Sequence, residues 1–445
     1  MDFANYLPDE LLLEILEYVQ RLPAVLERQS SLARFCGVNR QWYDVGIGKL
    51  YESPYLAGRS YELFVRTVCP SVLAHIKPSS LSGLVRVLDL SHIVHNSNKA
   101  TTAREYFMHM WCVYCFGGGF TDSKWIGLLG RTKTSLDMFI APQASFAINC
   151  WASLSKCTHL RVLDLSLVSE AISFQSLNQT IRQLPDLREL YLPRCSSNYV
   201  LDESKTNSTL NIRWPPMLEH LSLSGSVSGQ FLWDMLRQPG NFPPTLASLS
   251  ILHCPGLDHK GIRPLLSNLA AALTTVELRD LPAVKHGRFN AILDWLPNLT
   301  TLSVALDYID TRFGNVPAHW DPAAWQASKP LHTLTLVSSG QTSIDPARCF
   351  TAIDLYALID ERFLGRLRFL NIAQSTGWGL EQDGAELEAL EMLLRDEVDK
   401  ENWVHRRWHY KHVPSTSEAV TYESWIRDTA MGRRMRPALR VLQNR

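Results

Sequence analysis

The chain has 445 residues with equal numbers of basic (Lys+Arg, 44) and acidic (Asp+Glu, 44) side chains, and 46% of its residues are apolar. This composition suits a packed protein of more than one domain and excludes an intrinsically disordered chain. The balanced charge argues against a nucleic-acid partner for the whole protein, which would need an excess of basic residues.

The cysteines and the N-terminal residues indicate the compartment. Nine cysteines are scattered along the chain, which is not the pattern of a disulfide framework. The first residues lack the charged and apolar regions of a signal peptide. No apolar run approaches the roughly 18 residues of a membrane span. We therefore expect a cytoplasmic or nuclear protein with no membrane partner.

Three short helices are expected within residues 6–52. The first opens at Leu7-Pro8, where proline suits the first turn. Its apolar residues recur at steps of three and four: Leu11, Leu12, Ile15, Leu16 and Val19. The second contains residues 31–36 and the third runs from about residue 38 to 51. Such a small unit has a marginal core, so it must lean either on a partner or, as an ordinary N-terminal cap, on the rest of the chain.

The order of these residues resembles an F-box. The run L-P-x-E-L-L-x-x-I-L-x-Y is followed by L-A-R-F-C-x-V-N-R-x-W and by an apolar residue near Leu50, so the resemblance covers residues 5–52. Two departures are the long polar link 20–30 and Asn39, where a cysteine is common. The resemblance implies binding to a SKP-family adaptor and, through it, to a cullin.

By position in the motif, seven residues are expected to contact the adaptor: Leu7, Pro8, Ile15, Leu16, Leu32, Val38 and Trp42. Trp42 has the size of an interface anchor. A core position within the helical module is the other interpretation of this residue.

A second pattern begins at residue 85 and repeats an apolar residue at positions one, four and six. Copies start at Val85, Leu160, Leu187, Leu218, Leu246, Leu273, Leu299, Leu331 and Leu367, with a weak copy at Leu136. From residue 160 the steps between copies are 27, 31, 28, 27, 26, 32 and 36 residues. The pattern is typical of leucine-rich repeats, whose units must stack to bury their apolar faces.

The expected fold class is an α/β repeat: an N-terminal three-helix F-box followed by a leucine-rich-repeat solenoid, with parallel strands on the concave face and helices on the convex face. Helices are expected at 228–237, 261–272 and 288–296. Cys195 and Cys254 lie eight residues after the first leucines of their copies, Leu187 and Leu246, as in a cysteine-containing repeat class common in F-box proteins. We expect both to be buried and inert.

Four regions follow from these patterns: 1–55 as the F-box, 56–84 as a helical linker or N-terminal cap, 85–375 as the repeats and 376–445 as a C-terminal cap. Insertions near 94–135 and 309–330 interrupt the repeats, either as binding loops or as surface elaborations. Because strand side chains alternate, a set of concave-face residues is expected to contact a substrate: Arg161, Asp164, Glu189, Tyr191, His220, Glu277, Arg279, Arg368 and Asn371.

The C-terminal region is basic and aromatic. Residues 381–399 are expected to form an acidic helix, and residues 403–445 then carry nine Lys+Arg against three Asp+Glu. Such a segment either binds an acidic or phosphorylated partner or a nucleic acid, or caps the solenoid with its charges in solvent.

We find no motif for catalysis, and we expect no cofactor and no metal. Cys112 and Cys115 with His109 lack the second ligand pair of a structural zinc site. Residues 225–229 have Val227 where a nucleophile elbow needs serine. Together with the resemblance, this predicts a non-catalytic substrate-recognition subunit of an SCF-type ubiquitin ligase, in the ubiquitin-conjugation pathway, with an unknown protein target. The alternatives are a repeat scaffold that acts outside a ligase and, third, an enzyme.

Overall fold

The computed structural model of the chain describes residues 7–69, 79–93, 127–143, 148–168, 174–193, 213–225, 227–236, 242–320, 327–340, 346–378, 384–406 and 421–442. Several features of the sequence lie outside these residues: residues 94–126 of the insertion predicted near 94–135, which include His109, Cys112 and Cys115, and also Cys195 and Trp408. Within the described part, no helix combines the length and the apolar character needed to cross a membrane.

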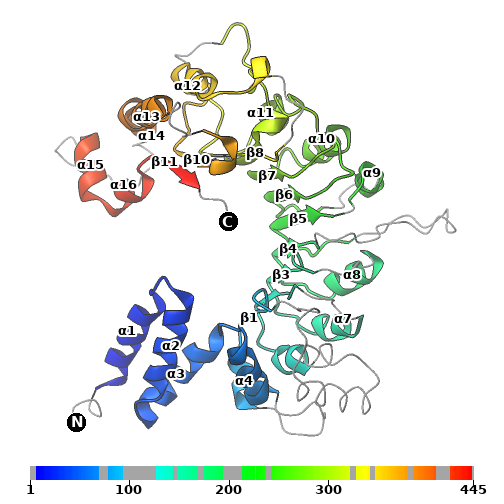
Figure 1. The fold of residues 1–445 in the computed structure, drawn as a ribbon, viewed down its shortest axis with the longest axis vertical. Coiled ribbons are helices and arrows are strands. Elements are labelled where there is room, and N and C mark those ends of the chain that lie inside the picture. Colours follow the sequence, from blue (N-terminus) through cyan, green and yellow to red (C-terminus); the bar gives the residue numbers. More distant parts are fainter. Residues whose placement is uncertain are drawn as a thin grey trace, which may run out of the picture. The chain divides into compact units, whose positions relative to one another are not determined.

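Residues 7–52 form the three expected helices, α1 (Asp9–Gln20), α2 (Val25–Cys36) and α3 (Arg40–Glu52) (Figure 1). We call them the helical module. Its core holds Leu12 and Leu16 from α1 and Leu32 and Phe35 from α2. The Trp42 ring of α3 lies 4.5 Å from the Phe35 ring. These residues are the apolar stripes that the helical spacing predicts.

Asn39 explains one departure from the F-box pattern. Its side-chain oxygen accepts a hydrogen bond of 3.0 Å from the backbone N–H of Trp42, so it caps the N-terminus of α3. Asparagine is among the best residues at this position because it satisfies a donor that the helix cannot pair. Asn39, at the position where the F-box pattern often has cysteine, therefore gives the third helix a defined start.

A short connection links the helical module to the first strand. It contains α4 (Arg59–Val68) and η2 (Ser80–Leu84). The backbone N–H of Arg86 donates to the carbonyl of Glu52, at 2.9 Å. The ring of Tyr55 packs 4.9 Å from that of His92. The end of α3 is therefore fixed against the beginning of the sheet.

The described residues form eleven strands in one sheet, ordered as they follow in the chain, and each registered pair is parallel. They are β1 (Val87–Asp89), β2 (Met138–Ile140), β3 (Val162–Asp164), β4 (Glu189–Tyr191), β5 (His220–Ser224), β6 (Ser248–Leu252), β7 (Thr275–Arg279), β8 (Thr301–Ala305), β9 (Thr333–Val337), β10 (Phe369–Ala373) and β11 (Ala438–Leu442). The first ten each coincide with one copy of the repeated motif, including the weak copy at Leu136.

The apolar residues of the repeated motif form the core beneath the sheet. Leu163, Leu190, Leu249 and Leu334, at the fourth position of their copies, are all 0% exposed. Each pairs in register with the apolar residue at the same position of the next copy where the register is defined: Leu163 with Leu190, Leu249 with Val276 and Leu334 with Leu370. Stacking of equivalent leucines is what closes the core between neighbouring repeats. The α/β architecture with a parallel sheet is thus confirmed, and it is compatible with a solenoid.

The segments between strands are partly helical. They include α7 (Ile148–Leu154), α8 (Phe174–Ile181), α9 (Gly229–Leu236), α10 (His259–Asn268), α11 (Ile292–Trp295) and α12 (Ala352–Asp360), with η3 (Leu306–Tyr308), η5 (Pro346–Arg348) and η6 (Gln374–Thr376). In the second half of the chain, α9 to α12 lie on one side of the strands (Figure 1). The helices expected at 228–237, 261–272 and 288–296 are present, although α11 is a single turn.

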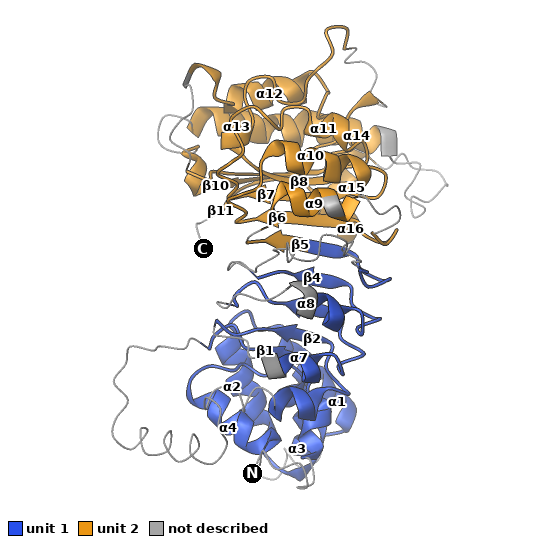
Figure 2. Ribbon diagram, turned by 90° about the vertical axis from the view of Figure 1, so that its right-hand side faces the viewer, with its two compact units in different colours: residues 1–221 blue, residues 222–445 orange. Residues whose placement is uncertain are grey.

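The chain divides into two compact units, Met1–Leu221 and Ser222–Arg445, and the boundary falls inside β5 (Figure 2). The second unit ends in helical segments: α13 (Gly384–Met392), the π-helical η7 (Leu393–Val398), α14 (Asp399–Arg406), α15 (Tyr422–Asp428) and α16 (Ala430–Met435). Trp403 and Trp425 are buried among them. The last strand, β11, then pairs with β10.

Cys254 is 0% exposed. Burial raises the pKa of its thiol to about 12. The thiol is therefore protonated at neutral pH and is a poor nucleophile, as expected for a structural cysteine.

Candidate functional site

Helix α1 carries two adjoining apolar stripes. Leu12, Leu16 and Val19 belong to the core of the helical module. One position earlier, Leu11, Ile15 and Tyr18 follow the same helical spacing. Leu11 is 46% exposed and Tyr18 is 63% exposed. The apolar surface of α1 is therefore wider than the module itself covers.

More apolar side chains are exposed on the same module. Val25 and Leu26 at the start of α2 are 44% and 62% exposed, and Val38, between α2 and α3, is 49% exposed. Leu13 of α1 is 51% exposed. Soluble proteins rarely expose many large apolar side chains on one small unit unless a partner covers them. The helical module is therefore our candidate protein-binding surface.

The seven residues predicted to contact an adaptor fall into three groups. Pro8 and Val38 are exposed, while Leu7, Ile15 and Trp42 are half-buried against the module core. Leu16 and Leu32, in contrast, are only 2% and 4% exposed.

The prediction is therefore corrected for Leu16 and Leu32. They pack inside the module, because the inner stripe of α1 meets α2 there. Leu11, Leu13, Tyr18, Val25 and Leu26 were missed, although one signal was visible. Leu11, Leu12, Leu13, Ile15 and Leu16 are too many apolar residues for one narrow helix face.

The start of α1 is held against α3. The side-chain amide of Gln41 donates to the carbonyl of Leu7, at 2.9 Å, and to the carboxylate of Asp9, at 2.8 Å. These bonds place the Leu7-Pro8 segment beside the third helix. Residues from the first and third helices are thereby presented together.

The predicted substrate-contact residues of the first unit interact with their neighbours on the strands. The hydroxyl of Tyr191 donates to Glu189, at 3.0 Å, and its ring lies 4.7 Å from that of His220. Asp164 accepts a hydrogen bond of 2.8 Å from the backbone N–H of Ser166, which holds the turn after its strand. Arg161 is exposed. These residues lie on or beside neighbouring strands, and Asp164 also stabilises the turn after β3.

The predicted substrate-contact residues of the second unit also interact with side chains on the strands. Glu277 accepts a hydrogen bond from Ser250, at 3.1 Å, and lies 2.6 Å from the guanidinium of Arg279. The side-chain amide of Asn371 donates to Thr335, at 3.1 Å. Each pair joins polar groups on the strands, so these strands present both charges and neutral amides.

The structure contradicts the prediction that Arg368 contacts a substrate. Its side chain is 2% exposed and forms an ion pair of 3.3 Å with Asp399, which is 0% exposed. The alternation of strand side chains predicts it on the binding surface. The C-terminal segment that contains Asp399 covers it. Arg368 is therefore a core residue and is left out of the binding surface.

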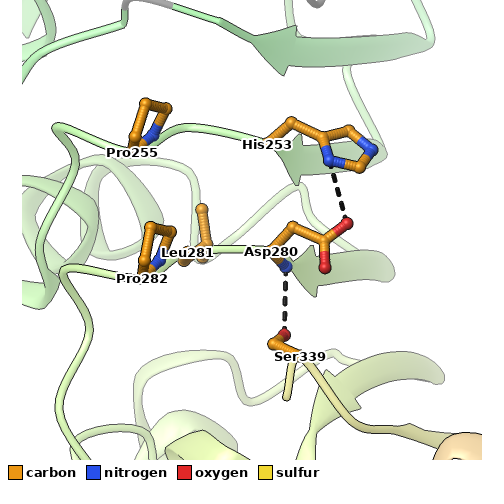
Figure 3. A pocket seen from close by; sticks show the side chains of 6 residues that line it. All are labelled: His253, Pro255, Asp280, Leu281, Pro282 and Ser339. Carbon is orange, nitrogen blue, oxygen red and sulfur yellow. Dashed lines mark hydrogen bonds and ion pairs between the residues drawn. The ribbon is translucent and has the colours of Figure 1, made fainter. Parts of the chain in front are cut away.

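A pocket of about 350 Å³ lies where β6, β7 and β9 end. Figure 3 shows His253, Asp280 and Ser339 along it. His253 and Asp280 directly follow their strands and have positive φ angles of 53° and 52°. The imidazole Nδ1 of His253 lies 2.9 Å from the carboxylate of Asp280. Non-glycine residues in this conformation are uncommon and often mark functional positions.

The pocket brings together serine, histidine and aspartate, but not in the order of a catalytic triad. The hydroxyl of Ser339 accepts a hydrogen bond of 3.1 Å from the backbone N–H of Asp280. It also lies 2.8 Å from the hydroxyl of Tyr308. His253 and Ser339 lie on opposite sides of Asp280 (Figure 3), whereas a nucleophilic serine needs its hydroxyl bonded to the histidine. The serine here connects successive repeats.

Two neighbours complete this connection. The hydroxyl of Tyr308, 0% exposed, accepts a hydrogen bond of 2.6 Å from the backbone N–H of Leu281. Burial raises the pKa of Tyr308. The buried carboxylate of Asp307 accepts from the backbone N–H of Ser339. Sequence reasoning missed this network because its members are far apart in the chain.

Comparison with known proteins agrees with the resemblance of residues 5–52. No protein-family model matches the chain. The chain is 27% identical over 367 residues to F-box protein YDR306C of Saccharomyces cerevisiae, an alignment that covers 81% of this chain and 66% of that protein, just under two thirds. It is 26% identical over 376 residues to Protein pof5 of Schizosaccharomyces pombe, with 84% of this chain and 91% of that protein covered. Alignments of this length include most of the strand-bearing part of the chain, and the name of the first relative supports an F-box protein.

Proposed function

We propose that this protein is the substrate-recognition subunit of an SCF-type ubiquitin ligase. In this proposal residues 5–52 are a functional F-box that binds a SKP-family adaptor and, through it, a cullin. The strand-bearing units are leucine-rich repeats that bind a target protein. The chain itself catalyses nothing. It holds the target close to a ubiquitin-conjugating enzyme, which raises the effective concentration of the reacting groups.

The second apolar stripe of α1 is the observation that carries the proposal. Leu11 and Tyr18 are exposed beside the stripe that fills the module core, and Ile15 between them is half-buried against that core. A helix of an isolated module would gain nothing from this exposure, since apolar area in water costs about 25 cal/mol per Å². A second protein that covers the stripe would gain that energy. The resemblance and the named relative support a SKP-family adaptor as that protein.

The target-binding surface in this proposal consists of polar side chains on the strands. We propose Arg161, Glu189, Tyr191, His220, Glu277, Arg279 and Asn371 as contact residues, with Asp164 as a secondary one. Both charge signs occur among them, as suits a protein surface with complementary charges. The C-terminal region 376–445 acts as the cap of the repeats.

Surface variants of the helical module test the adaptor interaction. We expect Leu11→Ser and Val38→Ser each to weaken binding to a purified SKP-family adaptor, about thirtyfold for an anchor of about 2 kcal/mol. Both side chains are about half exposed, so the module keeps its core. Isothermal titration calorimetry with the full chain measures the effect.

Ile353→Ser is the matched control, because Ile353 of α12 is 63% exposed but lies in the other unit. It should bind the adaptor as the unchanged chain does. Equal affinity of all three variants would overturn the proposed interface. Absence of any adaptor binding by the unchanged chain would favour the alternative, a repeat scaffold outside a ligase.

A further inference from the structure

The strand β11 is the last strand of the sheet in the described part of the chain (Figure 1). It pairs on one side with β10, where Leu439 lies opposite Leu370 and Val441 opposite Ile372. Both residues of β10 are 0% exposed, whereas Val441 is 48% exposed and Leu439 is half-buried. Although α13 lies against β11, the apolar side chains that β10 buries are therefore partly uncovered on β11. We call residues 438–442 the open edge.

The backbone of the same two residues also faces away from the sheet. The N–H of Ala438 donates to the carbonyl of Arg368, just before β10, at 3.0 Å. Successive residues of a strand direct their backbone groups to opposite sides. The N–H and C=O groups of Leu439 and Val441 therefore point away from β10. Such a row of backbone groups is a template for another strand.

Arginines lie at the open edge. Arg440 stands between the two apolar residues, in register with Asn371, and its side chain is exposed. Arg434 and Arg436 precede the strand and are also exposed. Among the residues that the structure describes, none of the three arginines forms a salt bridge, although other arginines of this region do. The open edge therefore combines apolar side chains with positive charge.

The sheet itself shows how an arginine is neutralised from a neighbouring repeat. Arg188 and Glu219 occupy the second positions of adjacent motif copies in unit 1, and their charged groups lie 2.9 Å apart. Opposite charges on neighbouring strands stabilise a sheet, whereas like charges directly opposite each other destabilise it. An added strand with a carboxylate beside Arg440 would provide the equivalent partner at the open edge.

We propose that the open edge binds an extended peptide segment of a partner protein, which adds to the sheet as a further strand and has an acidic residue between two apolar ones. The acidic residue lies beside Arg440, and the two apolar residues cover Leu439 and Val441. Residues 276–278 of β7 have such a sequence, V-E-L, so the pattern is compatible with this sheet. The inference goes beyond the proposed function and does not depend on it, because it follows from the edge strand alone.

A second copy of this chain is a less suitable occupant. Two identical edge strands pair symmetrically about a two-fold axis, which makes them antiparallel. Because Arg440 is the central residue of β11, pairing centred on the strand would bring two Arg440 side chains directly opposite each other. Like charges in this position are unfavourable. Charge therefore favours an acidic partner over self-association.

A nucleic acid also suits this edge less well. Single strands are bound largely by stacking of their bases on aromatic rings. Trp403 and Trp425, in the helices before β11, are both buried and offer no ring for stacking. Unlike a peptide, a nucleic acid cannot continue the backbone hydrogen bonding of a strand.

The probe is a fluorescein-labelled, amidated peptide, Ser-Thr-Val-Glu-Leu-Thr-Ser, and fluorescence anisotropy with the full chain measures its binding. We expect a dissociation constant on the order of 100 micromolar for so short a ligand. Val441→Pro should weaken binding about tenfold, because it removes one outward N–H. Proline is tolerated on an edge strand where the N–H faces solvent, so the pairing with β10 is kept.

A charge exchange tests the role of Arg440. Arg440→Glu should weaken binding of the probe about tenfold. The same variant should bind Ser-Thr-Val-Lys-Leu-Thr-Ser more tightly than the unchanged chain does, a gain that misfolding cannot produce. Arg66→Glu is the matched control, since Arg66 of α4 is exposed and lies in the other unit. It should leave both affinities unchanged.

Four outcomes would overturn the assignment. They are failure of the unchanged chain to bind the probe, equal binding by the Val441→Pro chain, no gain for the lysine peptide with Arg440→Glu, and tighter binding of an octathymidylate strand than of the probe. Sedimentation velocity tests the second copy as occupant. A dimer of the unchanged chain that Val441→Pro abolishes would assign the open edge to self-association instead.

Discussion

At the scale of single residues, the buried ion pair of Arg368 and Asp399 joins β10 to the C-terminal segment. Asp399 also accepts a hydrogen bond of 2.6 Å from the hydroxyl of Tyr422, and Arg368 donates to the carbonyl of Met435, at 3.3 Å. Burial and the bond to Asp399 raise the pKa of Tyr422, which keeps its proton available as a donor. Several elements thus contribute partners to the two charges.

Removal of one partner should be costly, because the other charge remains buried without compensation. We expect Arg368→Met to destabilise unit 2 by about 3–5 kcal/mol. The double variant Arg368→Met/Asp399→Leu should recover a large part of this loss, since two apolar side chains replace two charges. Urea unfolding of the full chain measures both. Equal losses in the single and the double variant would contradict the pairing.

At the scale of elements, the contact of α2 with α3 depends on one glycine. A Cβ atom at Gly46 would lie 2.7 Å from Cδ1 of Phe35 and 2.9 Å from Sγ of Cys36. At Gly48, two residues later in the same helix, nothing lies within 4 Å of such an atom. The two glycines therefore differ only in whether the neighbouring helix approaches closely.

This difference gives a matched pair of variants. We expect Gly46→Ala to destabilise the helical module by about 1–3 kcal/mol through overpacking. Gly48→Ala should stabilise it by about 0.5–1 kcal/mol, because alanine favours the helix. Hydrogen exchange of the α2 and α3 peptides, followed by mass spectrometry, reports on the module alone. Faster exchange in Gly48→Ala than in Gly46→Ala would refute the packing argument.

At the scale of the whole molecule, stability depends on coupling between neighbouring repeats. Within unit 2, Asp310 bonds to Asn290 at 2.6 Å, to Arg312 at 2.9 Å and to Arg348 at 3.2 Å. These partners precede α11, follow β8 and follow β9 respectively, so one carboxylate joins three repeats. Burial acts to raise the pKa of Asp310, but the hydrogen bonds from Arg312 and Asn290 outweigh it and hold the pKa at about 2.

A pKa below the ordinary value of 3.8 makes this clamp sensitive to acid. The stabilisation is complete above that ordinary value and disappears as the pH falls from it through about 2. We expect a loss of about 2 kcal/mol across this window. Asp310→Asn should remove this part of the acid dependence, whereas Asp360→Asn, on the exposed end of α12, should not. Thermal unfolding between pH 2 and 5 tests this, and identical acid profiles would contradict it.

Much of the fold could be predicted because its signal is local and periodic. Ten strands lie on the ten motif copies, since each copy carries the apolar residues that must be buried there. The strand β11 was missed because its copy has Arg436 where the others have their first apolar residue, 69 residues after Leu367. Pairing with β10, rather than its own pattern, makes this segment a strand.

The candidate sites were less accessible, since they depend on which side of an element meets another element. The sequence by itself determined the three N-terminal helices, the positions of the stacked strands and the buried leucines, because helical and strand periodicity dictate burial locally. Only the tertiary structure decided that Leu16 faces inward while Leu11 faces outward, that Arg368 is covered, and that Arg440 lies on the edge strand of the sheet. The physical reason is that each of these outcomes depends on contacts between residues far apart in the chain, which no local pattern encodes.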